Sequence, residues 1–144
     1  MKKTTKPNSA FKLNSFTIIE FHIERNPVKQ GKSDIIIKPS GQLDKTAQTF
    51  NLILDVAVKD ENESFKISLT AVGIFSFNSQ IEEQELSNYF LTNAPAIIFP
   101  YIRAYISSVT ALSGLKTVNL PVMNMSYLKD ELKENIKNII DQIR

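Results

Sequence analysis

The chain has 144 residues, which is enough for one domain with a hydrophobic core of its own. It contains no cysteine, so disulfides, thiolate nucleophiles and cysteine-bound metals are excluded. Its 17 Lys and Arg residues nearly balance 15 Asp and Glu residues, and the net charge of +2 does not indicate a nucleic-acid-binding protein.

The amino-terminal segment is basic and polar. Residues 1–10 predict a flexible basic tail, and residues 11–144 predict a single domain. A secretory signal needs an apolar run after its basic opening, and this chain has a polar stretch there. We therefore expect the protein to stay in the cytoplasm.

Four stretches predict strands of an antiparallel sheet. Residues 15–25 alternate in polarity, a weaker strand is expected over 34–38 before Pro39-Ser40-Gly41 ends it, and residues 50–59 and 65–77 alternate around a polar turn. In the first strand the predicted faces are Thr17, Ile19, Phe21 and Ile23 on one side, and Phe16, Ile18, Glu20, His22 and Glu24 on the other. A shared polar face indicates that helices cover only one side of the sheet.

The second half of the chain has helical spacing. An acidic opening favours a short helix over 81–91. Asn93 is expected to cap a longer helix that reaches about Leu112, where Ser113-Gly114 ends it. A last helix with one apolar stripe is expected over 126–144. The fold class is therefore α+β, with a four-stranded antiparallel sheet and helices on one face.

The longer helix lacks the charged side that a helix covering one sheet normally shows. Only Arg103 is charged in this stretch, so we expect the uncovered side to face other copies of the chain in a homo-oligomer. The candidate interface residues are Ile98, Ile102, Tyr105, Ile106 and Val109. One alternative is a helix wholly internal to a monomer. Another is a membrane span, which Pro95, Pro100 and Arg103 oppose.

Residues for catalysis are scarce. The only histidine, His22, falls on the polar face, the four glycines are isolated, and no metal-binding or nucleophile motif occurs, so we predict no enzyme, no metal and no cofactor. Four aromatic residues are candidates to line a groove for extended apolar peptides, although core packing is the commoner role for each. They are Phe16, Phe65, Phe75 and Tyr101.

Three segments resemble the signature of the SecB family of export chaperones. They are Gly73-Ile74-Phe75-Ser76, the run from Pro95 to Arg103 (PAIIFPYIR), and the linker from Val118 to Asn124 (VNLPVMN). The resemblance implies a dimer of dimers. It also implies an ATP-independent holdase that keeps unfolded or precursor proteins competent for translocation and passes them to the motor SecA.

The resemblance also assigns roles to particular residues. SecA docking in the family uses acidic residues on the exposed sheet face, two of which fall on Glu20 and Glu24, and the client groove maps to Phe65 and Tyr101. A third family carboxylate falls on Ser68 and its apolar neighbour on Lys66. Because of these departures, two alternatives stay open: a chaperone dedicated to one partner such as an antitoxin, and an oligomeric scaffold of SecB fold without clients.

Overall fold

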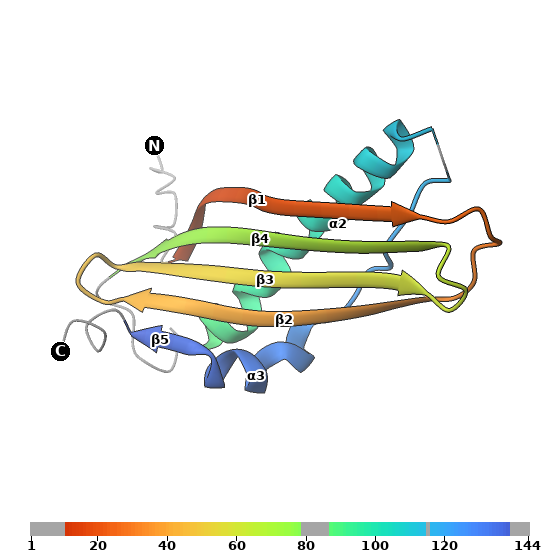
Figure 1. The fold of residues 1–144 in the computed structure, drawn as a ribbon. Coiled ribbons are helices and arrows are strands. Elements are labelled where there is room, and N and C mark those ends of the chain that lie inside the picture. Colours follow the sequence, from red (N-terminus) through yellow and green to blue (C-terminus); the bar gives the residue numbers. More distant parts are fainter. Residues whose placement is uncertain (1–10, 79–86, 115, 139–144) are drawn as a thin grey trace, which may run out of the picture.

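The computed structural model describes residues 11–78, 87–114 and 116–138. The fold is α+β, as predicted, and its sheet has the strand order β1-β4-β3-β2-β5 (Figure 1). The strands are β1 (Phe11–Arg25), β2 (Ser33–Asp44), β3 (Thr49–Asp60), β4 (Phe65–Phe77) and β5 (Ile136–Asn138). The helices are the π-helix η1 (Tyr89–Asn93), α2 (Ala94–Leu112), the 3-10 helix η2 (Met125–Leu128) and α3 (Lys129–Glu134).

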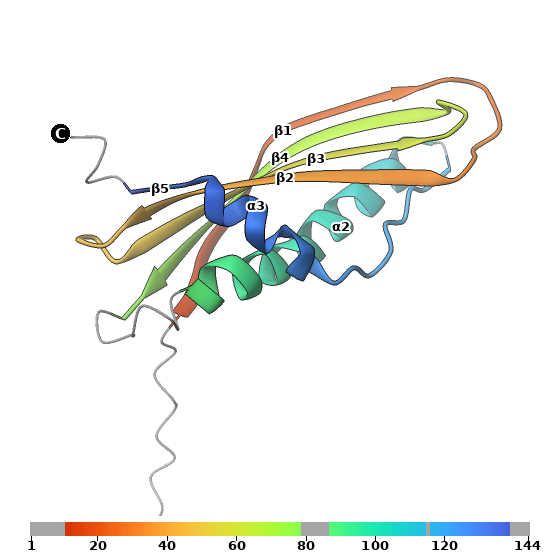
Figure 2. The same ribbon diagram turned by 90° about the horizontal axis from the view of Figure 1, so that it is seen from below.

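Strands β1 to β4 form the predicted antiparallel sheet, and the short β5 adds a parallel strand at its β2 edge. Figure 2 shows α2 lying across one face of this sheet, while none of the helices that the structure describes lies on the opposite face. The predicted alternation of β3 and β4 is confirmed, because every second side chain from Leu52 to Val58 and from Phe65 to Phe77 is buried. The core therefore lies between these two strands and the helices.

The predicted faces of β1 are wrong in its first half. The register with β4 shifts between Leu13 and Ser15 and again between Ile18 and Glu20, so the strand carries two bulges. The second bulge places Ile19 in solvent, 64% exposed, and brings Phe16 and Ile18 onto the same face as Phe21. Glu20, His22 and Glu24 remain on the exposed face.

The predicted end of the second strand at Pro39 is also wrong. Strand β2 continues in register with β3 to Asp44. The carbonyl of Pro39 and the N–H of Gly41 both point to the β5 side, where they meet Asn135. Proline is tolerated here because its missing N–H falls on the outer edge of the four-stranded sheet.

Helix α2 begins without the predicted Asn93 cap, because η1 runs directly into it and Asn93 is itself helical. The predicted helix over 81–91 lies largely outside the described residues. At the other end α2 stops at Leu112, as predicted, and Gly114 takes a positive φ of 78°. Over the sheet, a Cβ on Gly73 would lie 2.8 Å from Cγ2 of Ile98, so this glycine allows the close approach of α2.

Helix α3 ends at Glu134, whereas the last helix was predicted to continue to residue 144. Asn135 ends α3, and its carbonyl accepts a hydrogen bond from the N–H of Gly41 at 3.2 Å. From there the chain pairs with Gly41–Leu43 as β5. The apolar residues of this segment have helical spacing, but the segment forms a strand because the edge of β2 has unpaired backbone groups that it can bond. Residues 139–144 lie outside the described part.

In the part of the chain that the structure describes, one helical stretch, Tyr89–Leu112, is long and apolar enough to cross a membrane by length and composition. Its inner side is nevertheless packed on the sheet, because Ile98, Ile102 and Ile106 are fully buried there. The same composition is found in core helices of domains without a membrane span, and the packing on β3 and β4 favours that role.

The loops at the end of the sheet where β1 and β3 finish are joined through the buried carboxylate of Asp60. It accepts hydrogen bonds from the Ser64 hydroxyl at 2.6 Å, the Gly31 N–H at 2.8 Å and the Phe65 N–H at 3.2 Å. Burial by itself raises the pKa of Asp60, but these donors outweigh it and lower the pKa from 3.8 to about 2.

We expect Asp60 to make the fold acid-sensitive. Its pKa is lower in the folded chain than in the unfolded chain, so its contribution to stability is complete above pH 3.8 and is lost as the pH falls through about 2. Urea midpoints of the wild type and Asp60→Asn should therefore differ most above pH 3.8 and converge towards pH 2. A constant difference across this range would contradict the assignment.

Candidate functional site

Helix α2 has four distinct sides. Its inner side packs on the sheet, and three of the predicted interface residues, Ile98, Ile102 and Ile106, are fully buried there. A second side is tied to the following linker: Arg103 Nε donates to the Leu120 carbonyl at 3.3 Å, and the Ser107 hydroxyl donates to Asn119 Oδ1 at 3.1 Å. The helix's only charged residue is thus turned away from its back.

The outward back of α2 carries no charged residue. We call it the uncharged ridge, and it consists of Ile97, Pro100, Ala104, Ser108, Ala111 and Leu112. All six are exposed, and Leu112 is 87% exposed. A helix that faced only water would carry Lys or Glu here. The missing charge is visible in the sequence, but the predicted interface residues Ile98, Ile102 and Ile106 lie on the buried side of α2.

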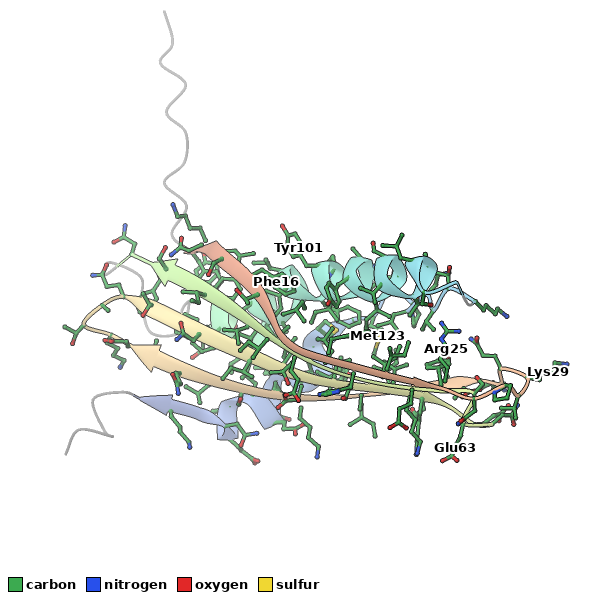
Figure 3. The ribbon with its side chains drawn as sticks, turned by 45° about the horizontal axis from the view of Figure 1, so that its top comes forward. Phe16, Arg25, Lys29, Glu63, Tyr101 and Met123 are labelled. Atoms are coloured by element: carbon green, nitrogen blue, oxygen red, sulfur yellow. The ribbon has the colours of Figure 1, made fainter. Side chains whose placement is uncertain are left out.

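The fourth side of α2 faces β1 and is aromatic. The rings of Phe16 and Tyr101 stack with centroids 5.3 Å apart, and Phe21 meets Tyr105 edge-on at the same distance. We call these four residues the aromatic flank. Tyr101 is 52% exposed, and Figure 3 shows it next to Phe16 at the surface between β1 and α2. The predicted candidates Phe16 and Tyr101 are therefore brought together.

The apolar surface continues along β1 beyond the aromatic flank. Leu13, Ile18 and Ile23 face the core but are only partly buried, unlike their neighbours on β4. The cause is position, because β1 is the edge strand of the sheet and no described strand covers its outer side. An extended apolar segment could lie along this strip and bury it further.

The other two predicted groove residues lie in the core. Phe65 and Phe75 are buried on the central strand β4, and Phe75 stacks on Phe11 with centroids 4.8 Å apart. Neither ring is accessible in the folded chain. Tyr105 and Val109, which were predicted for the oligomer interface, are half-buried.

The exposed face of the sheet holds the two predicted docking carboxylates. Glu20 and Glu24 both point to solvent from β1. His22 lies between them on the same face, and its Nε2 is 2.8 Å from Oε1 of Glu20. The strand alternation thus places all three side chains where a partner can reach them.

Positive charges stand beside these carboxylates. In the sheet register Glu24, Lys66, Lys59 and Asp34 follow one another across four strands. They border a hollow of about 510 Å³ whose floor includes Ala57 and Ser68. The face is therefore mixed in charge rather than acidic. Within the described residues, no group of three His, Asp or Glu side chains is placed to hold a metal ion.

Comparison with known families gives one match over most of the chain. The family described as preprotein translocase subunit SecB matches residues 19–134. The protein-export protein SecB of Anaplasma marginale (strain Florida) is 27% identical over 104 residues, which cover 70% of this chain and 59% of the relative. That of Buchnera aphidicola subsp. Schizaphis graminum is 41% identical over 71 residues, 49% of this chain and 46% of the relative.

A solved structure has the same fold. It is the Mycobacterium tuberculosis Rv1957 SecB-like chaperone in complex with a ChAD peptide from the Rv1956 HigA1 antitoxin. The TM-score is 0.67 at 16% sequence identity, and the match covers 79% of this chain and 88% of that chain. At this identity the likeness concerns the fold.

Proposed function

Because the chain belongs to the SecB family, we propose that it is an ATP-independent chaperone that binds unfolded or precursor polypeptides and keeps them competent for translocation. The observation that carries this proposal is the aromatic flank, where Phe16 and Tyr101 form an exposed stacked pair. Aromatic rings offer a large contact area at low entropy cost, as the binding of varied apolar segments requires. Relatives named as export proteins favour a binding role over catalysis.

Light scattering of a chemically unfolded client protein tests this proposal directly. In the absence of ATP, the full chain at less than one copy per client should slow aggregation. An unrelated protein of similar size and charge serves as the control. No suppression at any ratio would overturn the chaperone proposal and favour the oligomeric scaffold.

We further propose that the chain forms a cytoplasmic homotetramer, a dimer of dimers, through the uncharged ridge. None of its six exposed residues is charged. Burying them against another copy would therefore remove this surface from solvent without desolvating a charge. At about 100° per residue Tyr101 lies next to Ser108 on α2, so this exposed part of the aromatic flank borders the ridge, whereas Phe16 and Phe21 lie on β1.

Two partner assignments follow for the exposed sheet face, and they can be separated. The exposure of Glu20 and Glu24 on β1 supports docking of SecA, whereas Lys66 and Ser68 stand where the family pattern has an apolar and an acidic residue. The mixed charge favours a chaperone dedicated to one partner, and the structural relative was solved with an antitoxin peptide. The test compares the affinity of the wild type for SecA at low salt with that of Glu20→Lys and Glu24→Lys. If the wild type has no affinity for SecA, the export assignment is excluded.

A further inference from the structure

A second cavity, of about 440 Å³, lies on the α2 side of the sheet where β1 ends. It is lined by Arg25, Asn26, Pro27, Val28, Gln30, Ser64 and Lys116. Two cations and no carboxylate are among these lining residues. It is also distinct from the hollow on the exposed face of the sheet, which has other lining residues.

Arg25 is the central group of this cavity. It follows Phe21 and Ile23 on the core-facing side of β1, and it is half-buried. One N–H of its Nη2 atom donates to the Lys116 carbonyl at 2.5 Å. Its Nε atom is buried and has no hydrogen-bond partner. A guanidinium has five N–H donors, and a buried one without an acceptor is costly.

The acidic residues nearby do not neutralise Arg25. The carboxylate of Asp60 is occupied by Ser64, Gly31 and Phe65. The carboxylate of Glu63 lies 3.6 Å from the Lys66 ammonium, and Figure 3 shows Glu63 and Arg25 on opposite sides of the sheet. The described residues thus supply this guanidinium with no ion pair.

We propose that this cavity is a carboxylate-binding site that takes an acidic side chain or the C-terminal carboxylate of a bound peptide. Arg25 and Lys116 would hold the carboxylate, since a guanidinium and an ammonium make the strongest hydrogen bonds to such a group. The exposed Val28 and Pro27 form an apolar wall for the residue that carries it.

The place of the cavity explains how a peptide reaches it. Arg25 continues the row of Phe16, Ile18, Phe21 and Ile23 along β1, so an extended segment on the apolar strip ends at the cavity. That the carboxylate comes from a bound client therefore rests on the proposed chaperone function. The presence of Arg25 and Lys116 in the cavity does not depend on that proposal.

The test measures binding of short apolar peptides to the full chain by calorimetry at low salt. The probes are one peptide with a free C-terminal carboxylate, its C-terminal amide, and the amide with an internal Asp. We expect both carboxylate peptides to bind at least about tenfold more tightly than the amide without Asp. Lys116→Gln should remove this preference, as should Arg25→Gln if that variant folds.

Lys29→Gln is the matched control, because Lys29 lies between the lining residues Val28 and Gln30 but does not itself line the cavity. It should change the affinity by less than about twofold. Equal binding of acid and amide, unchanged binding by Lys116→Gln, or an equal loss in Lys29→Gln would overturn the inference. Binding of inorganic phosphate alone would also overturn it.

If the wild type slows aggregation without preferring carboxylates, only this inference fails. If it prefers carboxylates without slowing aggregation, the chaperone proposal fails.

Discussion

Replacing Tyr101 by glutamate should remove most of the ability to slow client aggregation. Tyr101 is 52% exposed and stacks on Phe16, so a carboxylate there places charge in the centre of the aromatic flank. Truncating a central aromatic contact typically costs about 2 kcal/mol or more of binding free energy. We therefore expect the concentration that halves aggregation to rise by at least about tenfold.

Tyr127→Glu is the control for this change. Tyr127 is a comparably exposed tyrosine, at 56%, but it lies on η2 away from the flank. Its variant should suppress aggregation as well as the wild type does. Equal activity of the two variants would show that the aromatic flank does not bind clients.

Phe50→Ala should cost the largest amount of stability. Phe50 is fully buried, its ring stacks on Phe90 with centroids 4.3 Å apart, and it occupies the space that a side chain at Gly41 would fill. Its loss opens a cavity between β3 and η1, so the free energy of unfolding should fall by about 3–5 kcal/mol. Urea unfolding at neutral pH measures this change.

Ile53→Ala provides the comparison within the same strand. Ile53 points to the other face of β3 and is only partly buried, so its truncation should cost less than about 1.5 kcal/mol. Similar losses in the two variants would contradict the assignment of the core to the helix-covered face.

The strands β3 and β4 could be predicted because they are central and their alternation is unbroken. In β1 the second bulge leaves the neighbouring Ile19 and Glu20 both exposed, which the regular alternation of a strand does not produce. Strict alternation missed it and exchanged the faces of Phe16 and Ile18. Glu20 and Glu24 kept their predicted exposed face because they follow the bulge.

The errors at β2 and at the carboxyl-terminal segment have one common cause. Pro39 fits within a strand, and the helix ends at Asn135, because these two parts of the chain meet at the sheet edge. That contact joins residues 96 positions apart, and local propensity does not contain it.

For the candidate site, the sequence indicated which residues face the core but not how deeply each lies. Phe16 on the edge strand stays accessible, whereas Phe65 and Phe75 on the central β4 are covered. Helical spacing likewise identified the missing charge of α2 but could not tell its sheet side from its open side. Depth follows from strand order, which is set by long-range pairing.

The proposed homotetramer depends on the uncharged ridge, and the mass of the full chain in solution is the measurement that decides it. Sedimentation equilibrium should give a multiple of the 16.3 kDa chain mass, four times for a dimer of dimers. Ala104→Arg, which places a charge on the ridge, should lower that multiple. A folded chain that stays at 16.3 kDa over all concentrations, and is unchanged by Ala104→Arg, would contradict the account.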